Sequence, residues 1–199
     1  KKQKHTINYC KNYLIVRKVI TNDQQERERP TGASMITKII KLTSDFKLLA
    51  GKYWIGDPCY VYPSHEWKDF CENLDKAGCY NYHTPEYIDG RDGLVCYYDN
   101  IQTDFLQKAL PFVFVATAYG DGCYALKQLD EEIGVLPVDS GSLSIVPVEL
   151  VDMWRQNDPN KHFNDNHGCY IETAISDVVA SKGNFDWDEF NVNTQGEDN

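Results

Sequence analysis

Short apolar runs separated by polar turns make up most of the chain after Met35. The runs are rich in the aromatic and β-branched residues that suit pleated surfaces, and Gly, Pro and Asp stand between them. This pattern predicts a mainly β (α+β) fold, a single compact sandwich or open barrel with a few peripheral helices. The runs expected to form strands are 36–42, 47–55, 95–98, 112–119, 123–129, 133–138, 142–146 and 169–174.

One segment has the periodicity of an amphipathic helix. Residues 64–74 (SHEWKDFCENL) start with Ser64, a residue type that caps helix N-termini. Two shorter helices are expected at 103–110 and 148–157. In the segment 64–74, apolar side chains recur at spacings of three and four and therefore share one face of the helix. They are Trp67, Phe70, Cys71 and Leu74.

The stretch AYGDGCYAL places Asp121 between two glycines and between two apolar runs. An Asp-Gly pair in this position is a strong local signal for a tight hairpin, because both central residues of a type I′ turn need positive φ. We therefore expect residues 112–129 to form one hairpin that turns at Asp121 and Gly122. Similar turns are expected at 139–141 and 89–90.

The composition changes at Met35. Residues 1–34 carry eight Lys/Arg against three Asp/Glu, a net charge of +5, whereas the whole chain carries −10, so residues 35–199 carry −15. The three codons before Met35 can include a purine-rich stretch like a bacterial ribosome-binding site. Residues 1–34 are therefore either a real basic arm or a non-native or disordered leader. We expect one β-rich domain over 35–190 and a frayed polar tail over 191–199.

The strongly acidic body limits the classes of partner. Its charge repels nucleic-acid and membrane phosphates and favours a basic protein or cations. No run reaches the roughly 18 apolar residues that a membrane span needs. Seven cysteines without a Cys-x-x-Cys pair are typical of buried free thiols in a reducing compartment. We therefore expect a cytoplasmic protein, in the host cytoplasm if a phage encodes it.

Three aspartates, Asp57, Asp121 and Asp139, lie at turns beside strand-like runs. Strand ends meet at one rim of a sandwich, so the three carboxylates would converge there and bind Ca²⁺ or Mg²⁺, which prefer oxygen ligands. The spacing matches no established metal loop, and the alternative is that each Asp only shapes its turn. No cofactor is predicted beyond this cation.

Two further groups contain residue types with site chemistry. Cys59 and His65 are, with Asp57, candidate catalytic residues for thiol chemistry if the fold brings them together, whereas a Cys59 thiol in a buried strand would stay inert. Zinc-type ligands also occur within one stretch of eight residues, although their spacing is not that of a paired zinc motif and an exposed polar loop is the alternative. These residues are His162, His167 and Cys169.

Three ordered blocks carry a resemblance. G-x-Y-x-I-x-D-P-C-Y begins at Gly51, G-D-G-x-Y begins at Gly120 and D-S-G begins at Asp139. With these blocks in this order, the chain resembles, over about residues 49–150, a group of small bacterial and bacteriophage proteins without an assigned activity. The resemblance implies a compact β-rich domain, and it implies no activity for any residue.

The charge and the lack of an enzyme motif favour an interaction protein. No G-x-S-x-G, Walker, dinucleotide-binding or H-E-x-x-H motif occurs. We expect a non-catalytic acidic protein of phage or bacterial origin that binds a basic surface of a host protein, without direct nucleic-acid or membrane binding. The alternative is a small metal-dependent or Cys-dependent hydrolase-like enzyme that uses the Asp-lined rim. The expected partner-binding residues are Asp186, Asp188 and Glu189.

Overall fold

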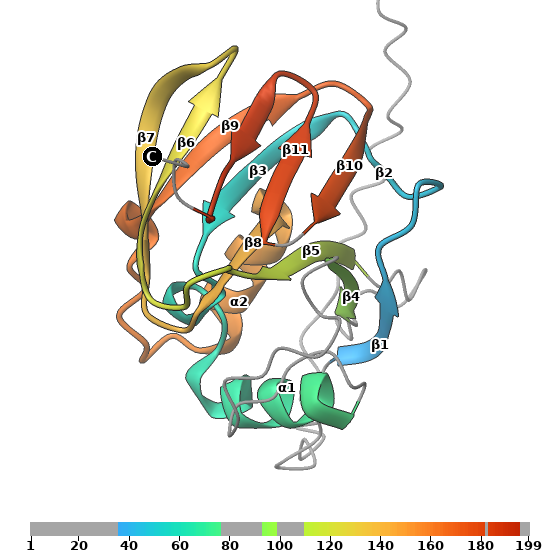
Figure 1. The fold of residues 1–199 in the computed structure, drawn as a ribbon. Coiled ribbons are helices and arrows are strands. Elements are labelled where there is room, and N and C mark those ends of the chain that lie inside the picture. Colours follow the sequence, from blue (N-terminus) through green and yellow to red (C-terminus); the bar gives the residue numbers. More distant parts are fainter. Residues whose placement is uncertain (1–35, 77–92, 99–109, 182, 196–199) are drawn as a thin grey trace, which may run out of the picture. The chain divides into compact units, whose positions relative to one another are not determined.

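The computed structural model describes residues 36–76, 93–98, 110–181 and 183–195, all within a unit that spans Gly32–Asn199. These residues form twelve strands in two antiparallel six-stranded sheets, together with two α-helices (Figure 1). The predicted mainly β fold is confirmed, and the described strands form no closed barrel. The two sheets face each other as a sandwich, with a hydrophobic core between them.

Three expectations concern residues outside the described part of the chain. They are the basic leader 1–34, the turn at 89–90 and the helix at 103–110. Of that expected helix only Leu110 is described, and it is the first residue of a strand. The expectations for the leader and for the turn stay predictions.

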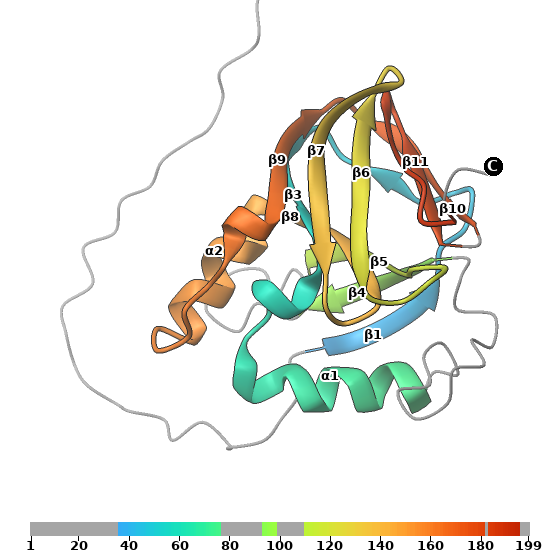
Figure 2. The same cartoon turned by 60° about the vertical axis from the view of Figure 1, so that its left-hand side comes forward.

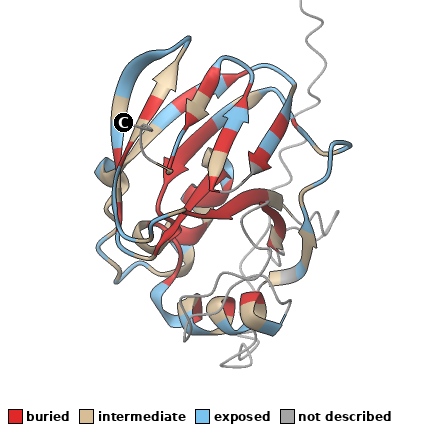
Figure 3. Cartoon of the chain, viewed as in Figure 1, coloured by how far each residue is buried: buried red, intermediate tan, exposed pale blue. Residues whose placement is uncertain are grey.

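Sheet 1 is buried on both faces. Along the strand Leu110–Ala116, Phe112 and Phe114 face one core, Val113 and Val115 face the other, and all four are buried. Figure 3 shows buried residues along this strand. A strand that is apolar on both faces fits the middle of a sheet covered on both sides. In spatial order the strands are β1 (Ile36–Lys41), β4 (Leu94–Tyr98), β5 (Leu110–Ala116), β8 (Ser142–Pro147), β3 (Gly51–Gly56) and β9 (Gly168–Thr173).

Sheet 2 turns one apolar face to the core. Tyr124 and Leu126 are buried, whereas the intervening side chains point outward, which is the alternation of a half-buried strand. The sequence analysis did not predict three of its strands, because they are only three to six residues long. In spatial order the strands are β2 (Lys47–Leu48), β10 (Ser176–Ser181), β11 (Asn184–Trp187), β12 (Phe190–Val192), β6 (Gly122–Gln128) and β7 (Glu131–Val138).

Two helices cover the face of sheet 1 that points away from sheet 2 (Figure 2). Both occur where the sequence predicts them, as α1 (Ser64–Lys76) and α2 (Val148–Asn157). Phe70 and Leu74 of α1 and Trp154 of α2 are buried in a second core against sheet 1. No described helix is long and apolar enough to cross a membrane.

The hairpin predicted around Asp121 is wrong. Strands β5 and β6 lie in different sheets, so residues 117–121 cross from sheet 1 to sheet 2. Positive φ falls at Gly120 (79°), whereas Gly122 is the first residue of β6. The turn at 139–141 also changes sheets, from β7 to β8. The reason is burial: β5 is apolar on both faces and β6 on one, so the two strands fit different layers.

The polar tail begins later than predicted. Asn191 and Val192 belong to β12, and Val192 is buried opposite Leu126 of β6. Thr194 is fully buried, and its hydroxyl donates a hydrogen bond to the carbonyl of Gly183 at 2.6 Å. The start of the expected tail is therefore part of the fold, because an apolar and a small polar side chain find partners in it.

Candidate functional site

A buried carboxylate follows the end of β3. Asp57 caps the 3₁₀ helix η1 (Pro58–Tyr60) by accepting a hydrogen bond from the backbone N–H of Cys59 at 2.8 Å. The hydroxyl of Ser140 donates to the same oxygen at 2.6 Å. The other oxygen accepts from the backbone N–H groups of Asp139 and Ser140 at 2.7 and 2.6 Å. We call this group, Asp57 with Cys59, Asp139 and Ser140, the Asp57 hub.

Four donors occupy the hydrogen-bonding sites of the Asp57 carboxylate. The residue is fully buried, and burying a carboxylate is costly unless donors replace its water. The donors come from η1 and from the β7–β8 turn, which is more than 80 residues away. Asp57 is therefore a cross-link between two connections of the sandwich as well as the turn residue that the sequence predicts.

The structure brings two of the three rim aspartates into contact. Asp57 accepts a hydrogen bond from the N–H of Asp139. Asp121 lies at the same end of sheet 2, because it precedes Gly122, which pairs with Val138. Among the described residues no group of three or more His, Cys, Asp or Glu side chains is arranged to hold a metal ion. The Ca²⁺ or Mg²⁺ site stays a prediction.

Cys59 and His65 lie in different networks. Burial, followed by the charge of Asp57, raises the pKa of the Cys59 thiol far above its usual range. A thiol that stays protonated is a poor nucleophile. The ring nitrogens of His65, at the start of α1, lie 3.4 Å from a carboxylate oxygen of Glu66 and 3.7 Å from one of Asp158. These described contacts do not pair the thiol with the imidazole.

The expected zinc ligands lie in three different surroundings. His162 is exposed. His167, in the 3₁₀ helix η3 (Asp165–His167), packs edge-on against the ring of Tyr60, with ring centres 4.6 Å apart. Cys169 of β9 packs against the core between the sheets. His167 therefore packs against η1 and Cys169 against the core, and zinc binding stays a prediction.

Sequence reasoning missed the polar contacts that hold the segment after α2. The guanidinium of Arg155 and the hydroxyl of Tyr170 both donate to one carboxylate oxygen of Asp165, Tyr170 at 2.8 Å. Lys161 Nζ donates to the carbonyl of Cys59 at 2.9 Å, across 102 positions of the chain. No local pattern signals a contact over such a separation, because each partner is an ordinary surface residue in its own segment.

Two turns bring five carboxylates together at one end of sheet 2. The β6–β7 hairpin turns at Leu129 and Asp130, which both have positive φ, 50° and 67°. The N–H of Leu129 donates to the carbonyl of Glu189 at 2.8 Å, so the hairpin tip lies against the β11–β12 turn at the upper end of Figure 1. We call this group the acidic end. Its exposed carboxylates are Asp130, Glu131, Glu132, Asp188 and Glu189.

The expected partner-binding residues lie in or beside the acidic end. Asp188 and Glu189 belong to it, and Asp186 lies one strand position back, on the outer face of β11 opposite Asn191. Burial raises the pKa of Asp186 from its ordinary value. Within the described chain, none of the five acidic-end carboxylates forms an ion pair. The other three carboxylates of the acidic end, at 130–132, were not predicted to bind a partner, although they form a continuous acidic run in the sequence.

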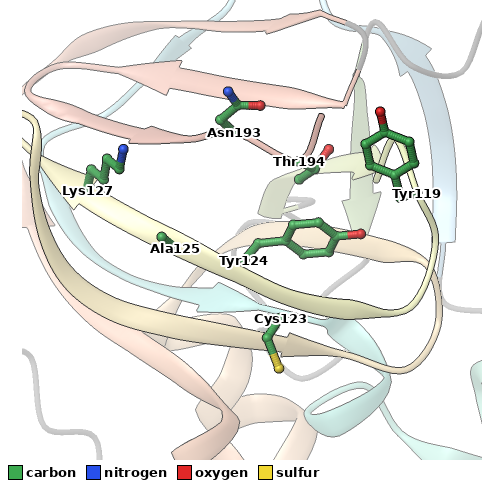
Figure 4. A pocket seen from close by; sticks show the side chains of 7 residues that line it. All are labelled: Tyr119, Cys123, Tyr124, Ala125, Lys127, Asn193 and Thr194. Carbon is green, nitrogen blue, oxygen red and sulfur yellow. The ribbon is translucent and has the colours of Figure 1, made fainter. Parts of the chain in front are cut away.

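A groove opens beside β6 in sheet 2. It has a volume of about 260 Å³ and lies where the chain after β12 turns away from β6. Figure 4 shows Tyr119 at one end and Lys127 at the other. We call it the β6 groove. Besides Tyr124, its lining consists of Tyr119, Cys123, Ala125, Lys127, Asn193 and Thr194.

Comparisons with protein-family models, with curated proteins and with solved structures found no match. The resemblance to bacterial and phage proteins therefore stays an expectation. Its first and third blocks do meet in the fold, because Asp57 of the first accepts hydrogen bonds from Asp139 and Ser140 of the third. These contacts join two connections of the sandwich, and they leave Asp57 no exposed oxygen for a partner.

Proposed function

We propose that this chain is a non-catalytic, acidic interaction protein of phage or bacterial origin that binds a basic surface of a host protein in the cytoplasm. The observation that carries the proposal is the acidic end, where the hydrogen bond from Leu129 to Glu189 holds two acidic turns side by side. The clustered carboxylates repel one another, and lysine and arginine side chains of a partner would offset that repulsion.

The charge of the whole body supports the same proposal. Residues 35–199 carry a net charge of −15. Such a field steers a basic partner toward the protein and raises the association rate, while it disfavours phosphate-rich partners. Because salt screens exposed charges over about 10 Å at 0.1 M, binding through the acidic end should weaken as ionic strength rises.

The alternative is a metal-dependent or Cys-dependent hydrolase-like enzyme at the Asp-lined rim, and the geometry supports it less. The Asp57 carboxylate is occupied by four donors, and the raised pKa of Cys59 keeps its thiol protonated. A rise in melting temperature on adding Ca²⁺ or Mg²⁺, relative to a chelator, would favour the metal-dependent alternative.

Affinity capture from bacterial lysate tests the proposed function. The wild-type protein is compared at low and moderate salt with a variant that carries three reversals, Asp186→Lys, Asp188→Lys and Glu189→Lys. We expect the wild type to capture a basic host protein at low salt. The capture should be lost at moderate salt and in the triple variant.

A matched control reverses three carboxylates on the helices, Asp69→Lys, Glu149→Lys and Asp152→Lys. The change in net charge is the same, but these residues lie on α1 and α2, on the other side of sheet 1. The control should keep the partner. Equal loss of capture in both variants would mean that net charge alone, and not the acidic end, is responsible. If the wild type captures no basic partner above background at low salt, the proposed function is contradicted.

A further inference from the structure

The outer face of sheet 2 carries an apolar strip beside the acidic end. Tyr124 and Leu126 point into the core, so the alternate residues of β6 point outward. On that face Ala125 pairs with Val135 of β7, whose side chain is 52% exposed. The described helices pack on sheet 1 and not on this face. Ala125 and Val135 therefore form a small apolar strip on the outer face of sheet 2.

The β6 groove shares Ala125 with this strip and lies on the β12 side of β6. Strand β12 pairs with β6 as far as Val192, opposite Leu126. Thr194 then leaves the sheet, because its Oγ1 accepts from the N–H of Ala118 at 2.9 Å and donates to Gly183. These two hydrogen bonds fix the far wall of the groove, so the groove is built into the fold.

The groove has the size and lining of an anchor site. Its volume of about 260 Å³ lies just below the range of small-molecule pockets, roughly 300–1,000 Å³, and suits one large side chain. Tyr119 stands at its end with 73% of its surface exposed, and Ala125 leaves space in the lining. Protein partners are commonly anchored by one apolar or aromatic side chain in such a depression.

The charges around the groove select the rest of the partner. One cross-strand row on the outer face runs from Asp186 through Asn191 and Lys127 to Glu132. Carboxylates therefore stand at both ends of this row, and the acidic end lies next to it. Lys127 is the charged side chain of the groove lining, and the carboxylates of this row and of the acidic end outnumber it, so the field around the groove favours lysine or arginine beside the anchor.

We propose that the β6 groove receives one apolar or aromatic side chain of the basic partner, with lysine or arginine residues on either side of it. This inference rests on the proposed function and names the part of the partner that is recognised. The acidic end attracts the partner, and the groove decides which basic segment stays bound.

Two fluorescein-labelled peptides of equal charge test the inference, Lys-Lys-Phe-Lys-Lys and Lys-Lys-Ser-Lys-Lys. Fluorescence anisotropy gives their Kd values for the wild type, for Ala125→Gln, for Tyr119→Ser and for the variant with reversals at 186, 188 and 189. The wild type should bind the Phe peptide about tenfold more tightly, since burying that ring removes apolar area from water. Both groove variants should lose this preference and keep their affinity for the Ser peptide.

The outcomes separate the inference from the proposed function. Reversal of the three acidic residues should weaken both peptides and leave the preference for Phe. Equal affinity of the wild type for the two peptides, or an unchanged preference in both groove variants, would overturn the inference. Unchanged affinity after charge reversal would instead count against the proposed function.

A second copy of this chain is the other occupant that the test distinguishes. Sedimentation of the wild type and of both groove variants reports on it, and thermal melts confirm that the variants fold. We expect a wild-type monomer. A dimer that Ala125→Gln and Tyr119→Ser both dissociate would show that the groove is a self-interface and would overturn the inference.

Discussion

The Asp57 hub and the acidic end use carboxylates in opposite ways. At the hub one carboxylate is fully buried and accepts four hydrogen bonds, whereas at the acidic end five exposed carboxylates form no ion pair within the described chain. Burial requires a donor for each acceptor site, so the hub carboxylate contributes to folding. Exposed carboxylates stay hydrated and add little stability. The acidic residues of this chain thus divide into those that stabilise the fold and those that contribute to the negative electrostatic potential of its surface.

The largest effect is expected when the hub loses its carboxylate. Asp57→Ala leaves three backbone N–H groups and the Ser140 hydroxyl without their acceptor, and each buried unsatisfied donor costs about 1–3 kcal/mol. The free energy of unfolding should fall by about 3 kcal/mol or more, measured by urea denaturation. Asp121→Ala is the matched control and should stay within about 0.5 kcal/mol, because Asp121 is exposed. Equal losses would remove the distinction between the hub and the exposed aspartates.

The hub should also suppress thiol chemistry. Burial and the charge of Asp57 raise the pKa of Cys59 far above its usual range, and burial raises that of Cys71 to about 11. Cys123, on the outer face of sheet 2, is exposed. Iodoacetamide at neutral pH should modify Cys59 more slowly than Cys123, by a factor on the order of 100. Mass spectrometry of the digested peptides measures the two rates. Modification of Cys59 at a similar rate would revive the catalytic thiol, and Cys59 should react fully once urea unfolds the chain.

The acidic end is expected to carry backbone strain. Leu129 and Asp130 both have positive φ, the conformation of a type I′ turn that favours Asn-Gly. Replacing the pair by Leu129→Asn and Asp130→Gly should raise the free energy of unfolding by about 1 kcal/mol, because the new residues adopt these angles at lower cost. Thermal melts measure the gain. The control Asp130→Ala keeps a Cβ at the same φ and should not raise the free energy of unfolding. A gain in stability in this control as well would mean that removing a charge, and not relieving strain, stabilises the turn.

The smallest effect concerns Asp165, which is paired but partly exposed. Burial raises its pKa, but the hydrogen bond from Tyr170 and the charge of Arg155 outweigh burial, so the folded pKa lies below its usual value. A lowered folded pKa adds stability above the unfolded pKa of about 3.9, and this stability is lost as pH falls through the folded pKa. Because the pair is partly exposed, the contribution should stay below about 1 kcal/mol.

Melting curves of Asp165→Asn between pH 7 and pH 2 test the sign of this effect. The wild type should melt at a higher temperature at neutral pH, and the difference should shrink below about pH 4 as the carboxylate takes up a proton. A difference that grows as pH falls would mean that the folded pKa is raised instead.

The local sequence pattern predicted those elements whose buried face can be recognised from the residues of one segment. In 64–76 the apolar residues recur at helical spacing, and the structure buries Phe70 and Leu74 on that face. The apolar run of β5 was recognised for the same reason. Strands β10, β11 and β12 were missed, because each has six residues or fewer and its inward residues, such as Phe185, meet their partners only in the core between the sheets.

The sequence by itself determined the mainly β class, both described helices, the acidic body and Asp57 as a turn residue, since each depends on neighbouring residues or on composition. Only the tertiary structure decided that residues 117–121 cross between sheets, that Asp57 meets Asp139, and that Leu129 meets Glu189. These contacts follow from which strands share a layer, and that is decided by the burial of whole faces. A turn signal reports the local backbone, whereas the partner of a strand or a carboxylate depends on every layer packed around it.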